Sequence, residues 1–258
     1  MTSYEAIFRR RSIRKYKNDE ISPAMLEKIE KFGEDAIGIR PDIQVKWKIF
    51  RKEEHQLKGL FRVDAPYYVV LYSEICEDYR KNAGCLMEQL SLYLFTKGIG
   101  SCYQGGAKLK KDQEKDLELV MIMAFGYPAA PLERSYEDFR RIELKKLVTI
   151  RGAFGKVQRK LLEAARLAPS AMNRQPWRFV SSEDRIHLFV KKPGKLGYQT
   201  QQDFNLFDAG VALSHMLVTA EDQWFDLEYQ KLDSILEKEF QNYVYVGSLL
   251  ILNDSEKI

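Results

Sequence analysis

The stretch NAGCLMEQLSLYLFTKGIG, residues 82–100, has a partner further along the chain in DAGVALSHMLVTAEDQW, residues 208–224. Both open with an (Asn/Asp)-Ala-Gly triplet and continue as a long, mostly apolar segment that favours a helix. A helix and two strands are expected before each segment, and a strand is expected after it. This self-similarity, with an offset of about 125 residues, predicts a chain built from two similar halves, residues 1–150 and 151–258.

The remaining elements follow from local signals. Thr2 and Glu5 have capping-box spacing and predict a short helix that ends near Arg11, and Ser22 with Pro23 opens a second helix. A short polar helix is expected between the glycine-containing loop 98–106 and residue 119. Further helices are predicted over 78–97, 156–168 and 205–220, and strands over 44–50, 66–72, 119–126, 177–181, 185–190, 225–229 and 244–252. The mixture is typical of the α+β or mixed α/β class.

Composition excludes few functions. The 258 residues are 45% hydrophobic and 30% charged, with a net charge of +4, which gives little reason to expect nucleic-acid binding. No apolar run is long enough to span a membrane, and the N-terminus lacks a signal peptide. The three cysteines form no CxxC pair, and His55, His187 and His215 lie far apart, so neither a disulfide framework nor a metal site is expected. We therefore expect a cytoplasmic protein.

Residues 7–16 read IFRRRSIRKY and carry an arginine cluster just after the first helix. Arg10, Arg11, Ser12 and Arg14 place three guanidinium groups and a hydroxyl within five residues. Guanidinium groups suit the bidentate recognition of phosphate oxygens, so the cluster predicts a local anion site. A solvated charge run or a nucleic-acid patch would explain the same residues.

Two loops offer further ligand-binding groups. In APSAMNRQPWRF, residues 168–179, Asn173 and Gln175 each carry a donor and an acceptor that could read the N–H and C=O edge of a flavin ring. In GIGSCYQGG, residues 98–106, Gly105 and Gly106 would let the backbone approach a flat ligand closely. An ordinary helix-to-strand connection and an ordinary turn are the alternatives.

Together with FGYP at residues 125–128, these segments resemble the nitroreductase family of FMN-dependent flavin enzymes. The resemblance implies an α+β fold with antiparallel or mixed sheets flanked by helices. It also implies roles in flavin binding. The arginine cluster would hold the phosphate and ribityl chain, and the Pro-Ser-x-x-Asn-x-Gln loop would reach the flavin as the partner subunit's loop does in family dimers. The residues so implicated are Arg10, Arg11, Ser12, Arg14, Gln104, Gly105, Gly106, Arg140, Arg141, Pro169, Ser170, Asn173 and Gln175.

The chain departs from the family in the spacing of these motifs. Ordinary members carry the arginine and amide motifs close together, whereas here Ser12 and Ser170 are 158 residues apart. The segment 37–50 keeps only Gln44 and Trp47 as an echo of the amide loop, and 147–160 contains no Arg-x-Ser-x-Arg. Half one thus keeps the arginine cluster, the glycine loop and the trailing arginines, while half two keeps the amide loop. We expect a monomer that mimics the family homodimer and binds one FMN.

The resemblance implies a function in which flavin carries the chemistry, so no catalytic protein nucleophile is expected. NAD(P)H would reduce the flavin, and an electron-poor small molecule such as a nitroaromatic or a quinone would reoxidise it in a ping-pong mechanism. Three alternatives stay open: an FMN storage or sensor protein without turnover, a cofactor-free interaction protein, and a nucleic-acid binder. No membrane partner is expected.

Overall fold

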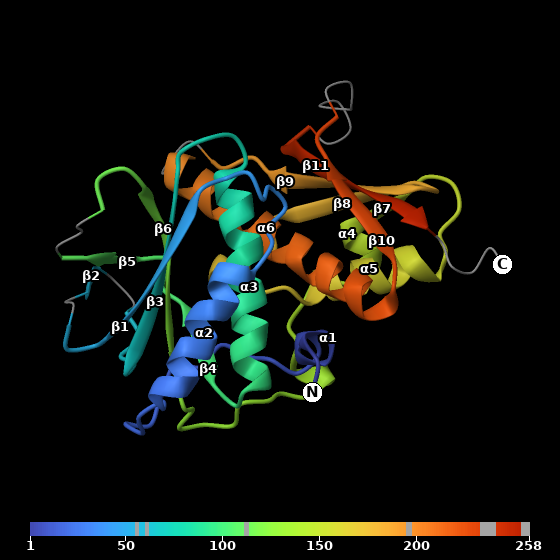
Figure 1. The fold of residues 1–258 in the computed structure, drawn as a ribbon. Coiled ribbons are helices and arrows are strands. Elements are labelled where there is room, and N and C mark those ends of the chain that lie inside the picture. Colours follow the sequence, from blue (N-terminus) through green and yellow to red (C-terminus); the bar gives the residue numbers. More distant parts are fainter. Residues whose placement is uncertain (55–56, 60–61, 111–113, 195–197, 233–240, 254–258) are drawn as a thin grey trace. The chain divides into compact units, whose positions relative to one another are not determined.

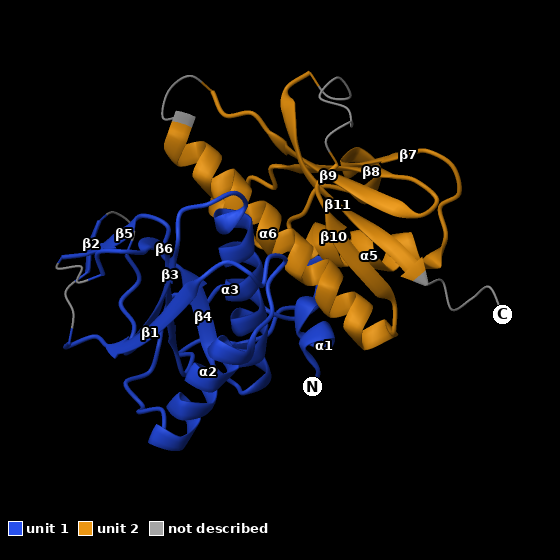
Figure 2. Ribbon diagram, turned by 45° about the horizontal axis from the view of Figure 1, so that its top comes forward, with its two compact units in different colours: residues 1–138 blue, residues 139–258 orange. Residues whose placement is uncertain are grey.

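The structure is a computed structural model that describes residues 1–54, 57–59, 62–110, 114–194, 198–232 and 241–253. The chain divides into two compact units, Met1–Asp138 and Phe139–Ile258 (Figure 2). Residues 139–150, which the sequence assigned to half one, belong to unit 2. No helix among the described residues is long and apolar enough to cross a membrane. His55 falls outside the described residues.

Unit 1 contains a four-stranded antiparallel sheet with the strand order β1-β3-β6-β4 and a separate two-stranded ribbon, β2-β5 (Figure 1). Its elements are α1 Ser3–Ile7, α2 Pro23–Asp35, β1 Val45–Arg51, β2 Leu57–Gly59, β3 Tyr67–Ser73, α3 Tyr79–Thr96, β4 Gly100–Tyr103, β5 Ala107–Leu109, β6 Glu118–Gly126 and the 3₁₀ helix η1 Tyr136–Asp138.

Both faces of the unit 1 sheet are covered. Helix α3 packs against β3, β4 and β6, and α2 packs against β1 and α3. A second apolar cluster that includes Phe50, Tyr68 and Ile122 is closed by residues of the β2-β5 ribbon such as Leu57 and Leu109. Every residue of β3 is therefore buried, as its continuous run of β-forming residues predicted.

Unit 2 contains a five-stranded sheet with the order β10-β11-β9-β8-β7 (Figure 1). Its elements are α4 Leu144–Leu147, β7 Val148–Ile150, α5 Lys156–Leu167, the 3₁₀ helix η2 Ala171–Asn173, β8 Trp177–Ser181, β9 Arg185–Lys191, α6 Tyr198–Gln223, β10 Asp226–Gln230 and β11 Tyr243–Asn253. Among the described strands of unit 2, only β7 pairs in parallel, with β8. Helix α6 packs against α5, β9 and β10.

The two sheets share one topology. In unit 1 the order β1-β3-β6-β4 is matched in unit 2 by β8-β9-β11-β10, and every neighbouring pair in both series is antiparallel. In each series a helix precedes the first strand, α2 or α5, and the long helix follows the second strand, α3 or α6. The two similar segments quoted from the sequence thus occupy the same place in two equivalent folds.

Most predicted elements are present, although several differ, and β2, α4, β7, η1 and η2 were not predicted. Helix α1 has the predicted capping box between Thr2 and Glu5 but ends at Ile7, because the chain then extends along strand β4. The loop 98–106 contains β4. In place of the short polar helix, residues 107–109 form β5; residues 111–113 lie outside the described residues, and 114–118 are not helical. Helix α6 begins at Tyr198, earlier than predicted.

Candidate functional site

Three of the sequence motifs meet in unit 1. The arginine segment runs parallel to β4, where Ser12 bridges Ser101 and the Ile13 N–H donates to the Ser101 carbonyl at 2.9 Å. It then reaches the FGYP segment, where Tyr16 bridges Pro128. The backbone of residues 10–17 is therefore fixed by the glycine loop and by FGYP, although the three motifs are far apart in sequence.

Two glycines allow this close packing. A Cβ atom on Gly100 would lie 2.5 Å from Cγ1 of Ile13, and a Cβ atom on Gly126 would lie 2.7 Å from Cγ of Pro66 and 3.2 Å from Cδ1 of Tyr16. Real Cβ atoms essentially never come within 3.0 Å of another heavy atom, so a side chain at residue 100 would displace Ile13 of the arginine segment, and one at residue 126 would displace Pro66.

Arg10 is turned into the protein and is held by a buried carboxylate. Its side chain is 4% exposed, and its Nε lies 3.8 Å from Oε1 of Glu88, whose side chain is fully buried in α3. The Tyr103 hydroxyl donates to Oε2 of Glu88 at 2.6 Å. Sequence analysis missed Glu88, because an isolated acidic residue in an apolar helix gives no sign of its partner. Arg10 therefore anchors the segment through Glu88.

The remaining donors of the cluster face outward. Arg11 and Arg14 are exposed and Ser12 is partly buried. Within the described part of the chain, the side chains of these three residues make no hydrogen bond or ion pair. Two guanidinium groups and a hydroxyl are thus available to a ligand.

A further arginine, Arg134, joins this cluster and was not predicted. Its backbone N–H donates to the Arg9 carbonyl at 2.9 Å. Burial, together with the positive charges of Arg10 and Arg11, lowers the pKa of Arg134 to about 10, although the Asp138 carboxylate acts in the opposite direction. It remains a cation at neutral pH, so several positive charges crowd together. A bound anion would relieve that repulsion.

Arg140 and Arg141, the predicted trailing basic residues of half one, lie in unit 2. Nη2 of Arg141 donates to the Leu167 carbonyl at 3.1 Å and Nη1 donates to Oδ1 of Asn173 at 2.7 Å. Arg141 therefore caps the C-terminal end of α5, where a cation is favoured. Both arginines therefore belong to unit 2 rather than to half one, and their contact with the flavin phosphate stays a prediction.

The amide loop of unit 2, residues 169–175, has an unusual backbone. Met172, Asn173 and Gln175 have φ angles of 50°, 56° and 50°. Residues other than glycine rarely adopt this left-handed region, and each such residue costs about 1–3 kcal/mol. Strain of this kind persists only where surrounding contacts enforce it, and it is frequent at ligand-binding sites.

Hydrogen bonds inside unit 2 enforce the conformation. The Ser170 hydroxyl accepts from the Gln175 N–H at 2.9 Å, and Oε1 of Gln175 accepts from the Ile142 N–H at 2.8 Å. Nδ2 of Asn173 donates to the Arg140 carbonyl at 2.9 Å. Gln175 is buried, whereas Asn173 is exposed and Pro169 and Ser170 are partly exposed. The amide of Gln175 therefore shapes the loop, and Asn173 is the amide that a ligand can reach.

Gln104 also has a structural role. It is buried, its Oε1 accepts from the Val63 N–H at 2.8 Å, and its Nε2 donates to the Cys102 carbonyl at 3.0 Å. Gly105 and Gly106 follow as an exposed turn between β4 and β5. The Gln104 side chain is thus hydrogen-bonded within unit 1. The contact of Gly105 and Gly106 with a flat ligand stays a prediction.

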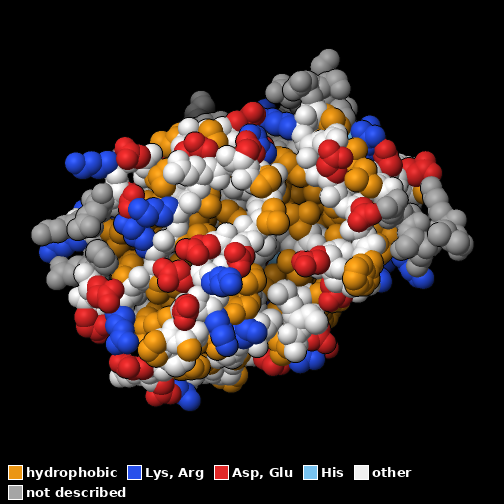
Figure 3. All heavy atoms as spheres, in the orientation of Figure 1, with side chains coloured by type: hydrophobic (Ala, Val, Ile, Leu, Met, Phe, Trp, Pro, Cys, Tyr) orange, Lys and Arg blue, Asp and Glu red, His pale blue; other side chains and the backbone are white. Residues whose placement is uncertain are grey.

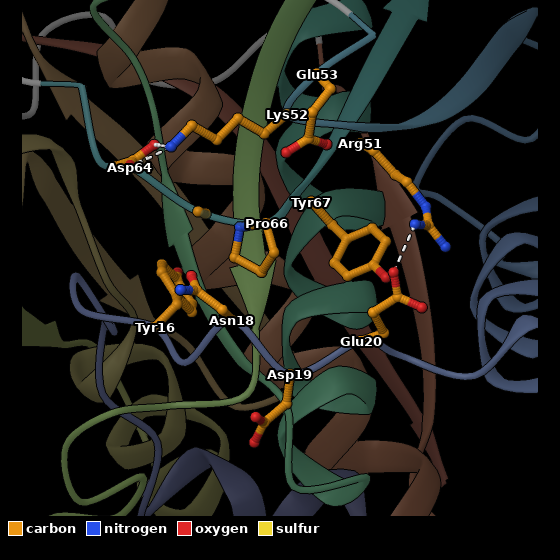
Figure 4. A pocket seen from close by; sticks show the side chains of 11 residues that line it. Tyr16, Asn18, Asp19, Glu20, Arg51, Lys52, Glu53, Asp64, Pro66 and Tyr67 are labelled. Atoms are coloured by element: carbon orange, nitrogen blue, oxygen red, sulfur yellow. Dashed lines mark hydrogen bonds and ion pairs between the residues drawn. The ribbon is translucent and has the colours of Figure 1, made fainter.

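A separate cavity of about 230 Å³ lies in unit 1 (Figure 4). Ion pairs from Lys52 to Asp64 and from Arg51 to Glu20 border it, at 2.7 and 2.9 Å. None of the predicted site residues lines it, and its volume is below that of pockets that bury drug-sized ligands. We do not assign it to the predicted site. On the face drawn in Figure 3, the described acidic and basic side chains are interspersed.

The comparisons with known proteins agree with this fold. Residues 2–220 match a family model described as "Putative TM nitroreductase". The structure is similar to that of a "putative nitroreductase" from Thermotoga maritima, with 22% identity, 98% of this chain and 95% of that chain covered, and a TM-score of 0.65. The family match spans most of the sequence, so the chain belongs to the nitroreductase family.

Shorter family proteins align with part of the chain. One, from Clostridium difficile 630, has 15% identity, 58% of this chain and 98% of that chain covered, and a TM-score of 0.48. Another, an FMN-dependent nitroreductase from Clostridium difficile R20291, has 18% identity, 54% and 96% coverage, and a TM-score of 0.42. No protein with a curated description matches the sequence.

Proposed function

We propose that this chain is an FMN-dependent oxidoreductase. When bound, FMN would supply hydride transfer from NAD(P)H to an electron-poor acceptor such as a nitroaromatic or a quinone. Family membership supports an oxidoreductase of this kind, and a similar protein is named as FMN-dependent. The observation that carries the proposal is the arginine cluster of unit 1, in which Arg11, Ser12 and Arg14 have available donors. The nearby Arg134 has a lowered pKa, which indicates that positive charges lie close together there.

These residues fit the phosphate of FMN. Arg11 and Arg14 would hold the phosphate oxygens through charge-assisted hydrogen bonds, and Ser12 would add a neutral donor. Arg134 would add a positive charge from behind, where burial protects it from screening. Arg10 would not bind directly in this arrangement, because Glu88 already neutralises it. Its part is to fix the backbone that presents the other donors.

The amide loop of unit 2 fits a flavin less fully. Gln175 and Gln104 already spend hydrogen-bonding groups within their own units. Asn173 is exposed and keeps one amide hydrogen beyond its bond to the Arg140 carbonyl. We therefore propose Asn173 as the flavin-reading side chain of this loop and Gln175 as its support. One FMN per chain, held by a fused pseudo-dimer, remains part of the proposal.

The proposal is tested by expressing the protein with excess riboflavin and measuring flavin released per chain. The bound flavin is then mixed anaerobically with NADH or NADPH, followed by a quinone or a nitroaromatic. We expect about one FMN per chain, bleaching on reduction and recovery with the acceptor. Bound FMN that neither nicotinamide reduces would indicate storage or sensing instead. A protein that binds no FMN would refute the proposal.

A further inference from the structure

The first residue of the repeated triplet makes the same kind of contact in both units. In unit 1, Oδ1 of Asn82 in α3 accepts from the backbone N–H of Arg40 at 3.0 Å. In unit 2, Oδ2 and Oδ1 of Asp208 in α6 accept from the backbone N–H of Ala171 at 3.0 and 3.2 Å. Asn82 is 1% exposed and Asp208 is 4% exposed.

The two acceptors hold equivalent loops. Residues 36–44 connect α2 to β1, and residues 168–176 connect α5 to β8, the matching helix and strand of the second unit. Unit 1 has also adapted to its anchor. A Cβ atom on Gly38 would lie 2.0 Å from Oδ1 of Asn82, so the loop can reach the amide only because residue 38 is glycine.

In unit 2 the anchored loop is the strained one. Ala171 immediately precedes Met172 and Asn173, both in the left-handed region. The bond from Ala171 to Asp208 joins this turn to the long helix of unit 2, while the other bonds of the turn reach Arg140, Arg141 and Ile142. Loss of the Asp208 acceptor would leave a partly buried N–H without its acceptor at the start of the turn.

We propose that Asn82 and Asp208 are positioning residues that fix the helix-to-strand loop of their units, and that the carboxyl in unit 2 makes only that loop respond to pH. The effect of this pH response on FMN binding rests on the proposed function, because Asn173 lies in the anchored loop. The hydrogen bonds from the two loops to Asn82 and Asp208 do not depend on that function.

The electrostatics of Asp208 support the pH response. Burial raises the pKa of this carboxyl to about 8, while the bond from Ala171 and the charge of Arg174 act in the opposite direction. Among the described residues, Arg174 is the charge that acts on it; α5, β9 and β10 also pack against α6 but contribute no such charge. Opening the loop would hydrate the carboxylate. The closed loop should therefore lose stability as pH rises toward 8.

Amide hydrogen exchange tests the anchors without FMN, on the full chain. We expect Asp208→Ala to speed exchange at Ala171 at least about tenfold and to leave exchange at Arg40 unchanged, because one partly buried hydrogen bond to a buried carboxyl is lost. Asn82→Ala should do the reverse. Exchange at Ala171 that is unchanged in Asp208→Ala would overturn the positioning role.

The substitutions Asp208→Asn and Asn82→Asp test the pH response, because they swap the two side-chain types between the units and keep an acceptor in each. Between about pH 6 and pH 9, the protection factor of Ala171 should fall in the wild type and stay level in Asp208→Asn. Asn82→Asp should give Arg40 the pH dependence that it lacks. An Asp208→Asn protein that keeps the wild-type pH profile would contradict the proposal.

The FMN dissociation constant, measured in the same proteins and pH range, completes the test. We expect FMN binding by the wild type to weaken with rising pH relative to Asp208→Asn, since the latter keeps its loop closed. A wild type that binds no FMN would refute the proposed function and leave the exchange results standing. FMN binding without any difference between the two proteins would refute the link from Asp208 to the flavin.

Discussion

The two units share a sheet topology, but they differ in whether the side chains of their candidate ligand-binding segments are available to a ligand or bonded within the unit. In unit 1, Arg11, Ser12 and Arg14 have open donors on a backbone fixed by neighbouring strands. In unit 2, Asn173 and Gln175 are tied into a dense network within the unit, at the cost of a strained turn. A fixed backbone whose side chains keep available donors is suited to binding an anion. A loop whose hydrogen-bonding groups are mostly satisfied within its unit is suited to presenting one exposed amide.

The largest expected effect concerns the anchor of the arginine cluster. Glu88→Ala should lower the free energy of unfolding by about 3–5 kcal/mol, because the buried guanidinium of Arg10 would lose its carboxylate. Urea unfolding measures this loss. Glu133→Ala is the matched control, since it removes a partly exposed partner of Arg9 and should change stability by less than about 1 kcal/mol. Equal losses in the two variants would show that the buried Arg10–Glu88 contact stabilises the fold no more than the exposed Arg9–Glu133 ion pair does.

The second prediction separates the two triplet anchors by pH. The pKa of Asp208 is about 8 in the folded protein against an ordinary value of 3.8, so the folded state binds the additional proton within this window. Stability of the wild type should therefore fall as pH rises through the window and level off above it. Asp208→Asn removes this loss, and its advantage should reach a few kcal/mol near pH 8, at about 1.4 kcal/mol per pKa unit. A pH-independent difference in Tm would refute the assignment.

The third prediction concerns the space around the anchor of unit 1. Gly38→Ala should lower stability by about 1–3 kcal/mol, since the new methyl group would overlap Oδ1 of Asn82. Gly194→Ala is the control, because a Cβ atom there meets nothing within 4 Å. Hydrogen exchange should locate the Gly38 effect at Arg40. Faster exchange at Ala171 would instead mean that the two loops are coupled.

The smallest expected effect on stability is at Arg134. Arg134→Met should raise the unfolding free energy of the FMN-free protein by up to about 1 kcal/mol, because burial and the repulsion from Arg10 and Arg11 outweigh the attraction of Asp138. The same variant should weaken FMN binding, measured by fluorescence quenching, by about tenfold or more. A variant that lost both stability and FMN affinity, or gained both, would argue against an anion site whose crowded positive charges are stabilised by the ligand.

Sequence reasoning predicted what depends on neighbouring residues in the chain. The capping box of Thr2, the Ser22–Pro23 helix start and the fully buried strand β3 were all readable from local signals. The matching sheet topology agrees with the repeat that the two triplets suggested. The clustering of arginines is also visible in sequence, and the role of the cluster in binding an anion stays a prediction.

What failed depends on contacts between distant segments. Nothing near Glu88 in the sequence shows that it faces Arg10, and nothing near Arg134 shows that it joins the arginine cluster. The end of α1 at Ile7 follows from the pairing of Ser12 with Ser101. The function of the triplets, anchoring a loop on the preceding connection, likewise needs three-dimensional proximity.

The most direct test of the account is an equilibrium titration with FMN of the wild type, Arg14→Ala and Arg51→Ala. Each variant removes one guanidinium from unit 1: the exposed Arg14 at the arginine cluster, or the partly exposed Arg51, which is ion-paired with Glu20 at the separate cavity. We predict one FMN per wild-type chain, binding weakened at least about tenfold in Arg14→Ala, and no change in Arg51→Ala. Binding that is lost in Arg51→Ala but retained in Arg14→Ala would contradict the assignment of the site.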